Sequence, residues 1–334
     1  MKKKILIVSI CVLLLLGCVA HVAAVSEGFE WPFSTAKENC AHEYTAIVSV
    51  EATCTDAGEV VYSCNKCGHS TKQSQEAFGH PAVLNGKCVL CDQPVSASEG
   101  LEYESSTEGD GYVVTGIGTC TDTTVVIPEM YNGEYVVKIG VQAFKGCANI
   151  KSVVIPEYVT TIGSEAFANC KALETVTFPS DLERIDDEAF LNCVNLSGIE
   201  LPEGLEHIGK SAFKYCLNIA TELVIPGSVT EIGEGAFFAC YHIQTLKIGS
   251  GNKPIQIAQD AFFCCIDLKT LILPERLTSV GDWSFFGCKN IEAVHFGGTE
   301  QQWQAITFGS KTKYEWDENV AADEIHYNSE GPIA

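Results

Sequence analysis

Apolar residues recur along the chain at intervals of 23 to 25 residues. In the first unit Ile139 stands five positions before Phe144, Ala143 directly before it, and Cys147 three positions after it. The pattern continues through seven units, the last with Ser in place of the Ala. A fixed period of this length is typical of repeat proteins, in which each unit buries its apolar face against its neighbours. The sequence therefore predicts a solenoid with one column of Phe: Phe144, Phe167, Phe190, Phe213, Phe237, Phe262 and Phe285.

Each unit also predicts one short strand with a defined end. Val153 and Ile155 alternate with Val154, which places two side chains in the core and one on the outer face of a sheet. Pro156 stops the strand, because it has no N–H to donate to the next unit. We expect strands in parallel pairing at residues 153–155, 176–178, 199–201, 223–225, 246–248, 271–273 and 294–296.

The return to the next strand is predicted as a tight turn followed by a short helical segment. Gly163 follows the aliphatic position, and glycine there favours a left-handed backbone, although Asp186 and Ala258 occupy the same position in other units. The Ala-Phe pair lies on the helical segment, with the Phe filling the unit. The Cys is interpreted as a small apolar thiol that fits the corner and donates weakly to a turn carbonyl.

This register resembles the BspA-like leucine-rich-repeat family of surface proteins over about two-thirds of the chain. Gly116 to Pro128 resembles the family's N-terminal coil, and Gly297 to Trp303, closing on Glu324 to Asn328, resembles its C-terminal cap. The resemblance implies an α/β repeat solenoid of right-handed leucine-rich-repeat coils, with a parallel β-sheet and short helical return turns. It also implies a concave sheet face that binds a protein or a host surface ligand.

The first residues predict export. Lys2, Lys3 and Lys4 precede an apolar run that ends at Gly17-Cys18, which is the secretory pattern. Leu15-Leu16-Gly17-Cys18 resembles the bacterial lipobox and implies a diacylated Cys18, hence an extracellular protein anchored by an N-terminal lipid. Cleavage after Ala24 and an uncleaved helical anchor are the alternatives. All three place the remaining chain outside the cytoplasm.

Residues 40–95 combine Cys and His in a pattern that suits structural zinc. Two Cys-x-x-Cys pairs let two thiolates hold one ion from a tight turn, and eight ligands would fill two tetrahedral sites. The segment resembles the short ribbon-like repeats of Gram-positive surface proteins. We expect Cys54, Cys64 and Cys67 in one site, completed by His80 or His42. The other candidates are Cys40, Cys88 and Cys91. Three disulfides among the six Cys are the alternative.

The net charge and the absence of known catalytic motifs limit the classes of function that the sequence supports. The formal net charge of −22 disfavours nucleic acids and anionic lipids as ligands. No phosphate loop, dinucleotide fingerprint or His-Glu-x-x-His motif occurs, so we predict a monomeric binding protein and not an enzyme. An architectural spacer in the envelope, or an enzyme using the Cys/His module, are the alternatives. The predicted partner surface on the strand face is Glu200, Glu222, Val224, Thr245 and Lys247.

The sequence thus predicts six segments. They are a lipoprotein signal peptide at 1–17, a spacer at 18–39, a zinc-ribbon-like module at 40–95, a capping coil at 96–128, the repeat array at 129–296, and a C-terminal cap and tail at 297–334.

Overall fold

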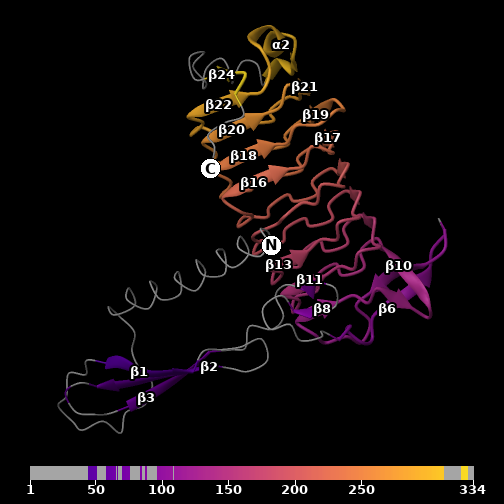
Figure 1. Cartoon of the computed structure of the whole chain (residues 1–334), viewed down its shortest axis with the longest axis vertical. Helices are drawn as coiled ribbons and strands as arrows, with labels where there is room; N and C mark the ends of the chain where they lie inside the picture. The colour runs from indigo at the N-terminus through magenta and orange to yellow at the C-terminus, as the bar shows by residue number, and fades with distance from the viewer. Residues whose placement is uncertain are drawn as a thin grey trace, which may run out of the picture. The chain divides into compact units, whose positions relative to one another are not determined.

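The computed structural model describes residues 44–50, 58–64, 66, 70–75, 83–84, 87–88, 96–107, 109–311 and 325–329. The chain divides into two compact units, Met1–Ala77 and Phe78–Ala334. The first unit contains a three-stranded antiparallel sheet in the order β1-β2-β3 (Figure 1). Its strands are β1 (Tyr44–Val50), β2 (Gly58–Cys64) and β3 (Ser70–Gln75).

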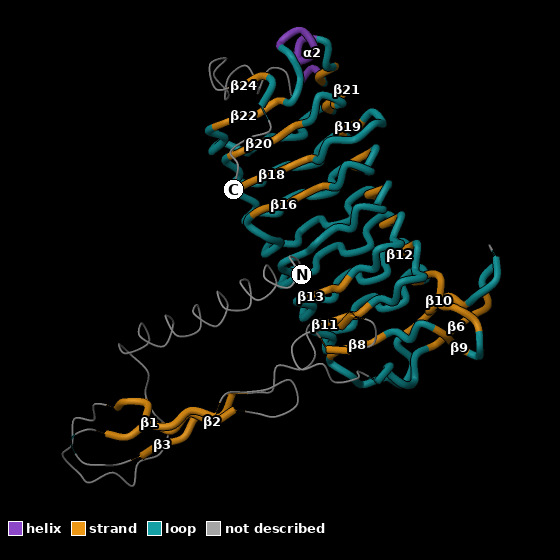
Figure 2. Tube along the Cα trace, viewed as in Figure 1, coloured by secondary structure: helices purple, strands orange, loops and turns teal. Residues whose placement is uncertain are grey.

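The second unit is a stack of coils in which parallel strands recur at two positions of the coil (Figure 2). One position forms the front sheets, of three and five strands. The three-stranded front sheet contains β8 (Thr124–Val126), β11 (Ser152–Val154) and β13 (Thr175–Thr177). The five-stranded one contains β16 (Glu222–Ile225), β18 (Thr245–Ile248), β20 (Thr270–Leu273), β22 (Ala293–Phe296) and β24 (Ile325–Tyr327). A separate antiparallel pair is formed by β4 (Val83–Leu84) and β5 (Lys87–Cys88).

The front strands lie where the sequence predicted them, within one residue, in six of seven coils. The prediction of a strand at 199–201 is wrong, since that coil carries no front strand and divides the front face into two sheets. Gly198 provides the reason. Its φ of 63° is left-handed, so the backbone departs from extended geometry just where the strand should begin.

The second position forms an eleven-stranded back sheet that the sequence analysis did not predict. The aliphatic residues five positions before each core Phe lie on it; for example, Ile162 pairs with Ile139 on one side and with Ile185 on the other. Its strands are β6 (Glu102–Ser105), β7 (Tyr112–Gly116), β9 (Met130–Tyr131), β10 (Glu134–Ile139), β12 (Thr161–Ile162), β14 (Arg184–Ile185), β15 (His207–Ile208), β17 (Glu231–Ile232), β19 (Ile255–Ile257), β21 (Leu277–Val280) and β23 (Thr307–Phe308).

The expected helical return turns are replaced by hydrogen-bonded turns. In the second coil the Cys170 N–H donates to the Phe167 carbonyl at 3.1 Å, yet Glu165 (φ 54°) and Asn169 (φ 64°) are both left-handed. Two left-handed residues per coil prevent a helix from propagating. The only helix in the described residues is α2 (Glu300–Gln304), so the architecture is a β-solenoid with two strand positions per coil. No helix in that part of the chain is long and apolar enough to cross a membrane.

The predicted left-handed backbone at Gly163 and its equivalents is also wrong. None of Gly163, Gly209 and Gly233 has a left-handed φ. A Cβ atom on Gly209 would instead lie 2.6 Å from the Asp186 carbonyl carbon of the preceding coil, and one on Gly233 would lie 2.6 Å from the Gly209 carbonyl carbon. Glycine is therefore present because neighbouring backbones approach closely at this turn.

The core is a continuous stack of phenylalanine rings. The rings of the predicted Phe column lie 5.0 to 5.4 Å apart between adjacent centroids and within 7° of parallel. Six of the seven have no exposed surface. At the C-terminal end Trp303 on α2 packs edge-on against Phe296, with centroids 5.2 Å apart. Thr299 and Gln302 form a capping box at the start of that helix. These contacts cover Phe296 at the C-terminal end of the stack, and the division of 297–334 into cap and tail stays a prediction.

Candidate functional site

Four of the five predicted partner-binding residues lie together on the five-stranded front sheet. In the parallel register of β16 and β18, Glu222 pairs with Thr245 and Val224 pairs with Lys247. Glu200 is exposed but lies in the coil without a front strand. The sheet therefore places the four residues in two neighbouring pairs across β16 and β18, and Glu200 lies outside the sheet.

Val224 is the apolar centre of this group. Its side chain is 43% exposed, whereas its neighbours Leu223 and Ile225 are buried at 1% and 0%. Lys247 beside it is exposed, and among the described residues it makes no ion pair. The outward column from Val224 through Lys247 continues across the sheet to Ile272 and His295.

The same column ends in a pair of histidines. His295 on β22 is paired with His326 on β24, and their rings stack with centroids 5.0 Å apart. His295 Nδ1 lies 2.9 Å from Ser329 Oγ. Burial, with a smaller contribution from His326, lowers the pKa of His295 below its ordinary value. Both causes therefore disfavour the protonated form of His295.

Most of the predicted lipid and zinc positions lie outside the described residues; this holds for Cys18, Cys40, His42, Cys54, Cys67, His80 and Cys91. Cys64 ends β2 and is buried at 2%, and the Lys66 N–H donates to its Sγ at 3.4 Å. Cys88 lies on β5. Within the described residues, no three His, Cys, Asp or Glu side chains are placed to hold a metal ion together.

The cysteine column is structural, as the sequence analysis interpreted it. Cys170 Sγ donates to the Phe144 carbonyl of the preceding coil at 2.9 Å, and Cys193 Sγ donates to the Phe167 carbonyl at 3.0 Å. Burial raises the pKa of the Cys170 thiol to about 12. A thiol with so high a pKa stays protonated and is a poor nucleophile. The same bond recurs in the later coils at Cys216, Cys240, Cys265 and Cys288.

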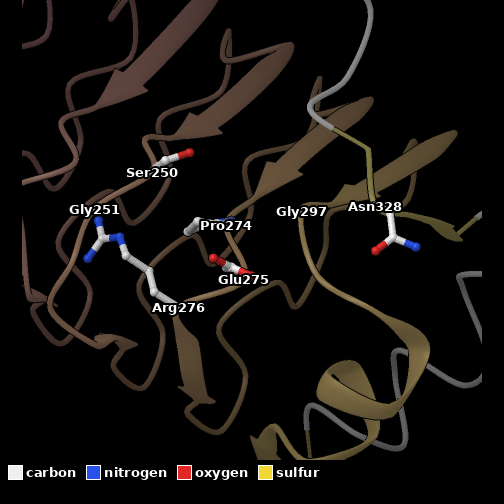
Figure 3. A pocket seen from close by; sticks show the side chains of 7 residues that line it. All are labelled: Ser250, Gly251, Pro274, Glu275, Arg276, Gly297 and Asn328. Atoms are coloured by element: carbon white, nitrogen blue, oxygen red, sulfur yellow. The ribbon is translucent and has the colours of Figure 1, made fainter.

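A pocket of about 220 Å³ lies beside the C-terminal strands (Figure 3). Its lining residues are Ser250, Gly251, Pro274, Glu275, Arg276, Gly297 and Asn328. The Arg276 side chain runs toward Gly251 and donates to the carbonyls of Gly249, Val229 and Lys253 at 2.8 to 3.1 Å. These three bonds tie the longer connection after β18 to the neighbouring coils. The guanidinium thus has a clear structural role.

One surface was missed by the sequence reasoning. In the last three full coils the residue directly after the core Phe is itself Phe, and these side chains form a second stack on the outside of the return turns. The signal was present in the sequence as three successive Phe-Phe pairs. The sequence analysis assigned the first Phe of each pair to the core column and assigned no role to the second.

The parallel coils, the two strand positions and the stacked Phe and Cys columns define a leucine-rich-repeat solenoid. The chain matches the sequence model of the BspA type Leucine rich repeat region, in six copies, over residues 137–256 and 246–315, and it belongs to that family.

Solved structures are similar to the repeat array. A leucine-rich repeat protein of T. pallidum (TpLRR) is 31% identical, with a TM-score of 0.54, over 59% of this chain and 90% of that one. A leucine-rich repeat protein of Bacteroides ovatus ATCC 8483 is 25% identical, with a TM-score of 0.42, over 63% of this chain and 66% of that one. No curated protein sequence matches the chain.

Proposed function

We propose that this protein is exported to the cell surface and binds a protein partner through the outer face of β16, β18 and β20. The exposure of Val224 carries the proposal. A β-branched side chain that is 43% exposed lies on a rigid sheet beside the charged Lys247 and Glu222. A mixture of apolar and charged groups on a preorganised backbone is suited to protein recognition.

Packing of the coils does not require the outward Val224 and Lys247, which are exposed, whereas the outward Ile272 on β20 is buried. The core contacts of β16 and β18 come from the inward residues Leu223, Ile225, Leu246 and Ile248, which are all buried. The outward column changes from Val224 to Lys247 to Ile272 while the inward positions stay aliphatic. Outward variation on a constant framework is how repeat proteins build extended binding surfaces.

Replacing Val224 by Asp together with Lys247 by Glu should weaken binding at least tenfold and leave the melting temperature nearly unchanged, because both side chains are exposed. The ligand would first be isolated by pulldown from host-matrix and bacterial-surface fractions. Binding of the purified ligand would then be measured by surface plasmon resonance.

A matched control on the back sheet is Glu231→Lys with Gln256→Asp, which changes paired exposed positions on β17 and β19. Unchanged affinity of the Val224/Lys247 variant would refute the front face as the binding surface. Loss of binding in the back-sheet control would move the surface there.

We further propose that a lipid on Cys18 anchors the chain and that residues 40–95 hold structural zinc. The zinc proposal is supported by the two Cys-x-x-Cys spacings and by the N–H that Lys66 donates to Cys64 Sγ, since such donation stabilises a thiolate ligand. Zinc would contribute folding energy to a segment too small for a sufficient core of its own.

Elemental analysis of the intact chain should find about two zinc ions per molecule if all eight candidate ligands bind metal. Double substitution of Cys64 and Cys67 by Ser should remove about one ion. Finding no metal, with the six Cys of the segment oxidised by mass spectrometry, would assign the segment to disulfides instead.

A further inference from the structure

An outer aromatic strip lies on the return turns of the last four coils. We define it as Tyr215, Phe238, Phe263 and Phe286. Phe238 stacks on Phe263 with centroids 4.6 Å apart and rings 2° from parallel, and Phe263 stacks on Phe286 at 4.9 Å. Tyr215 meets Phe238 edge-on at 5.7 Å. The strip thus extends the ring stacking of the core onto the surface.

The strip is exposed. Tyr215 is 39% exposed and Phe286 is 43% exposed, while Phe238 and Phe263 are half-buried. Ile266, two residues beyond Cys264 on the same turn, is 44% exposed. A contiguous apolar surface of this kind marks an interaction site on a soluble protein more often than a chance exposure.

The fold does not need aromatic residues at these positions. The position directly after the core Phe is Lys145, Ala168 and Leu191 in the first three coils. Those coils share the core Phe stack and the left-handed turn residues, and the second and third of them also share the Cys-to-carbonyl bond. The N-terminal coils therefore act as an internal control, in which the same backbone carries residues that are not aromatic. Coil formation therefore does not require the aromatic residues of the later coils.

Ring geometry indicates which chemistry can bind. The faces of Phe238 and Phe263 are covered by neighbouring rings, so the strip presents mostly ring edges to solvent. Sugars stack on open aromatic faces, and such faces are largely taken here. Apolar side chains of a polypeptide pack well against ring edges.

Two lysines beside the strip indicate which charged groups the partner carries. Lys214 places its Nζ 4.4 Å from the Phe238 ring centroid and 5.4 Å from that of Tyr215. Lys289 follows Phe286, at the other end of the strip, by three residues in sequence. Its charge lowers the pKa of the Cys264 thiol, although burial raises that pKa more. Within the described residues neither lysine has a carboxylate partner. Two unneutralised cations at the ends of an apolar strip stand out on a chain with a formal charge of −22.

We propose that the outer aromatic strip is a second docking surface, which binds a protein segment with large apolar side chains flanked by Asp or Glu. The apolar side chains pack along the edges of the ring stack, and the carboxylates meet Lys214 and Lys289. This surface is separate from the front face, and its occupancy does not depend on the front-face proposal.

The probe is a displayed library of random dodecapeptides, selected on the intact protein. The recovered peptides should contain an aromatic or branched aliphatic residue next to an acidic one. The double charge reversal Lys214→Glu with Lys289→Glu should weaken a synthetic copy of such a peptide at least tenfold by fluorescence anisotropy, less so at high salt. The double variant Phe238→Ala with Phe286→Lys, which borrows residues from the earlier coils, should weaken it similarly.

Matched controls occupy equivalent positions in the N-terminal coils. Lys171→Glu is the counterpart of Lys289→Glu, and Leu191→Ala is the counterpart of Phe238→Ala; neither should change peptide affinity. The Val224/Lys247 variant should also bind the peptide normally, which keeps the two surfaces distinguishable. Circular dichroism melts of every variant separate loss of binding from loss of folding.

Three results would overturn the proposal. Peptide binding that survives both strip variants would place the site elsewhere. Sedimentation velocity showing a dimer that the strip variants dissociate, with no peptide selected, would make a second copy of this chain the occupant. Strip-dependent binding to phosphatidylcholine–phosphatidylglycerol vesicles, again without a peptide, would make it a membrane contact.

Discussion

Replacing Phe190 by Ala should lower the free energy of unfolding by about 3–5 kcal/mol. Phe190 has no exposed surface, stacks between Phe167 and Phe213 at 5.2 Å on each side, and meets Phe178 edge-on at 5.8 Å. Removing the ring leaves a cavity in the middle of the stack, which the coils on either side prevent from collapsing. Equilibrium denaturation in urea, with wild type in parallel, measures the loss.

Phe286→Ala is the matched control for this prediction. It removes the same ring from the outer strip, where 43% of the side chain is already exposed, and it should cost about 1 kcal/mol or less. Equal losses for the two variants, or a loss below 1 kcal/mol for Phe190→Ala, would show that the inner Phe column is not the core of the solenoid.

Replacing Gly209 by Ala should cost about 3 kcal/mol, a large effect for a single methyl group. The new Cβ would lie 2.6 Å from both the Asp186 carbonyl carbon and the Asp187 nitrogen, and a backbone cannot move aside as a side chain can. The coils at 186–187 and 209 would have to separate, which would lengthen the bond that the Gly209 N–H makes with the Ile185 carbonyl at 2.8 Å. Thermal and urea unfolding would both report the loss.

Two controls separate this steric effect from backbone conformation. Gly146→Ala places a Cβ on a left-handed residue with open space around it, and it should cost about 1–2 kcal/mol through φ alone. Asp186 stands at the turn position of the preceding coil that corresponds to Gly209, and it already has a Cβ atom. Asp186→Ala should therefore change the free energy of unfolding by about 0.5 kcal/mol or less. A Gly209→Ala protein as stable as wild type would contradict the close approach of the two coils.

The packing role of the cysteine column could be predicted from the sequence, whereas its hydrogen-bond acceptors could not. Seven equivalent thiols at a fixed spacing cannot all pair with one another, so a packing role followed from the pattern. The structure supplied the acceptor, which is the carbonyl of a core Phe 26 to 28 residues earlier. No sequence rule names an acceptor at that distance, because it depends on how one coil is placed over the last.

The strand at 199–201 failed for a related reason. Ile199 and Leu201 keep the alternation that predicted it, and Ile199 is indeed buried at 7%. Gly198 immediately before them is left-handed, and glycine is the residue for which sequence gives least information on φ. Apolar pattern therefore predicted burial correctly, while the backbone path that decides strand pairing depended on one flexible residue.

The sequence by itself determined the period, the family, the Phe and Cys columns and all but one front strand, because each of these is a property of a single repeat multiplied along the chain. Only the tertiary structure decided the back sheet, the reason for Gly209, and the outer aromatic strip. Each of these arises between coils. Ile162 pairs with Ile139, Gly209 admits the backbone of Asp186, and Phe238 stacks on Phe263 because residues 23 to 25 positions apart are brought side by side. The distance between neighbouring backbones is set by the stacked core as a whole and cannot be read from one repeat.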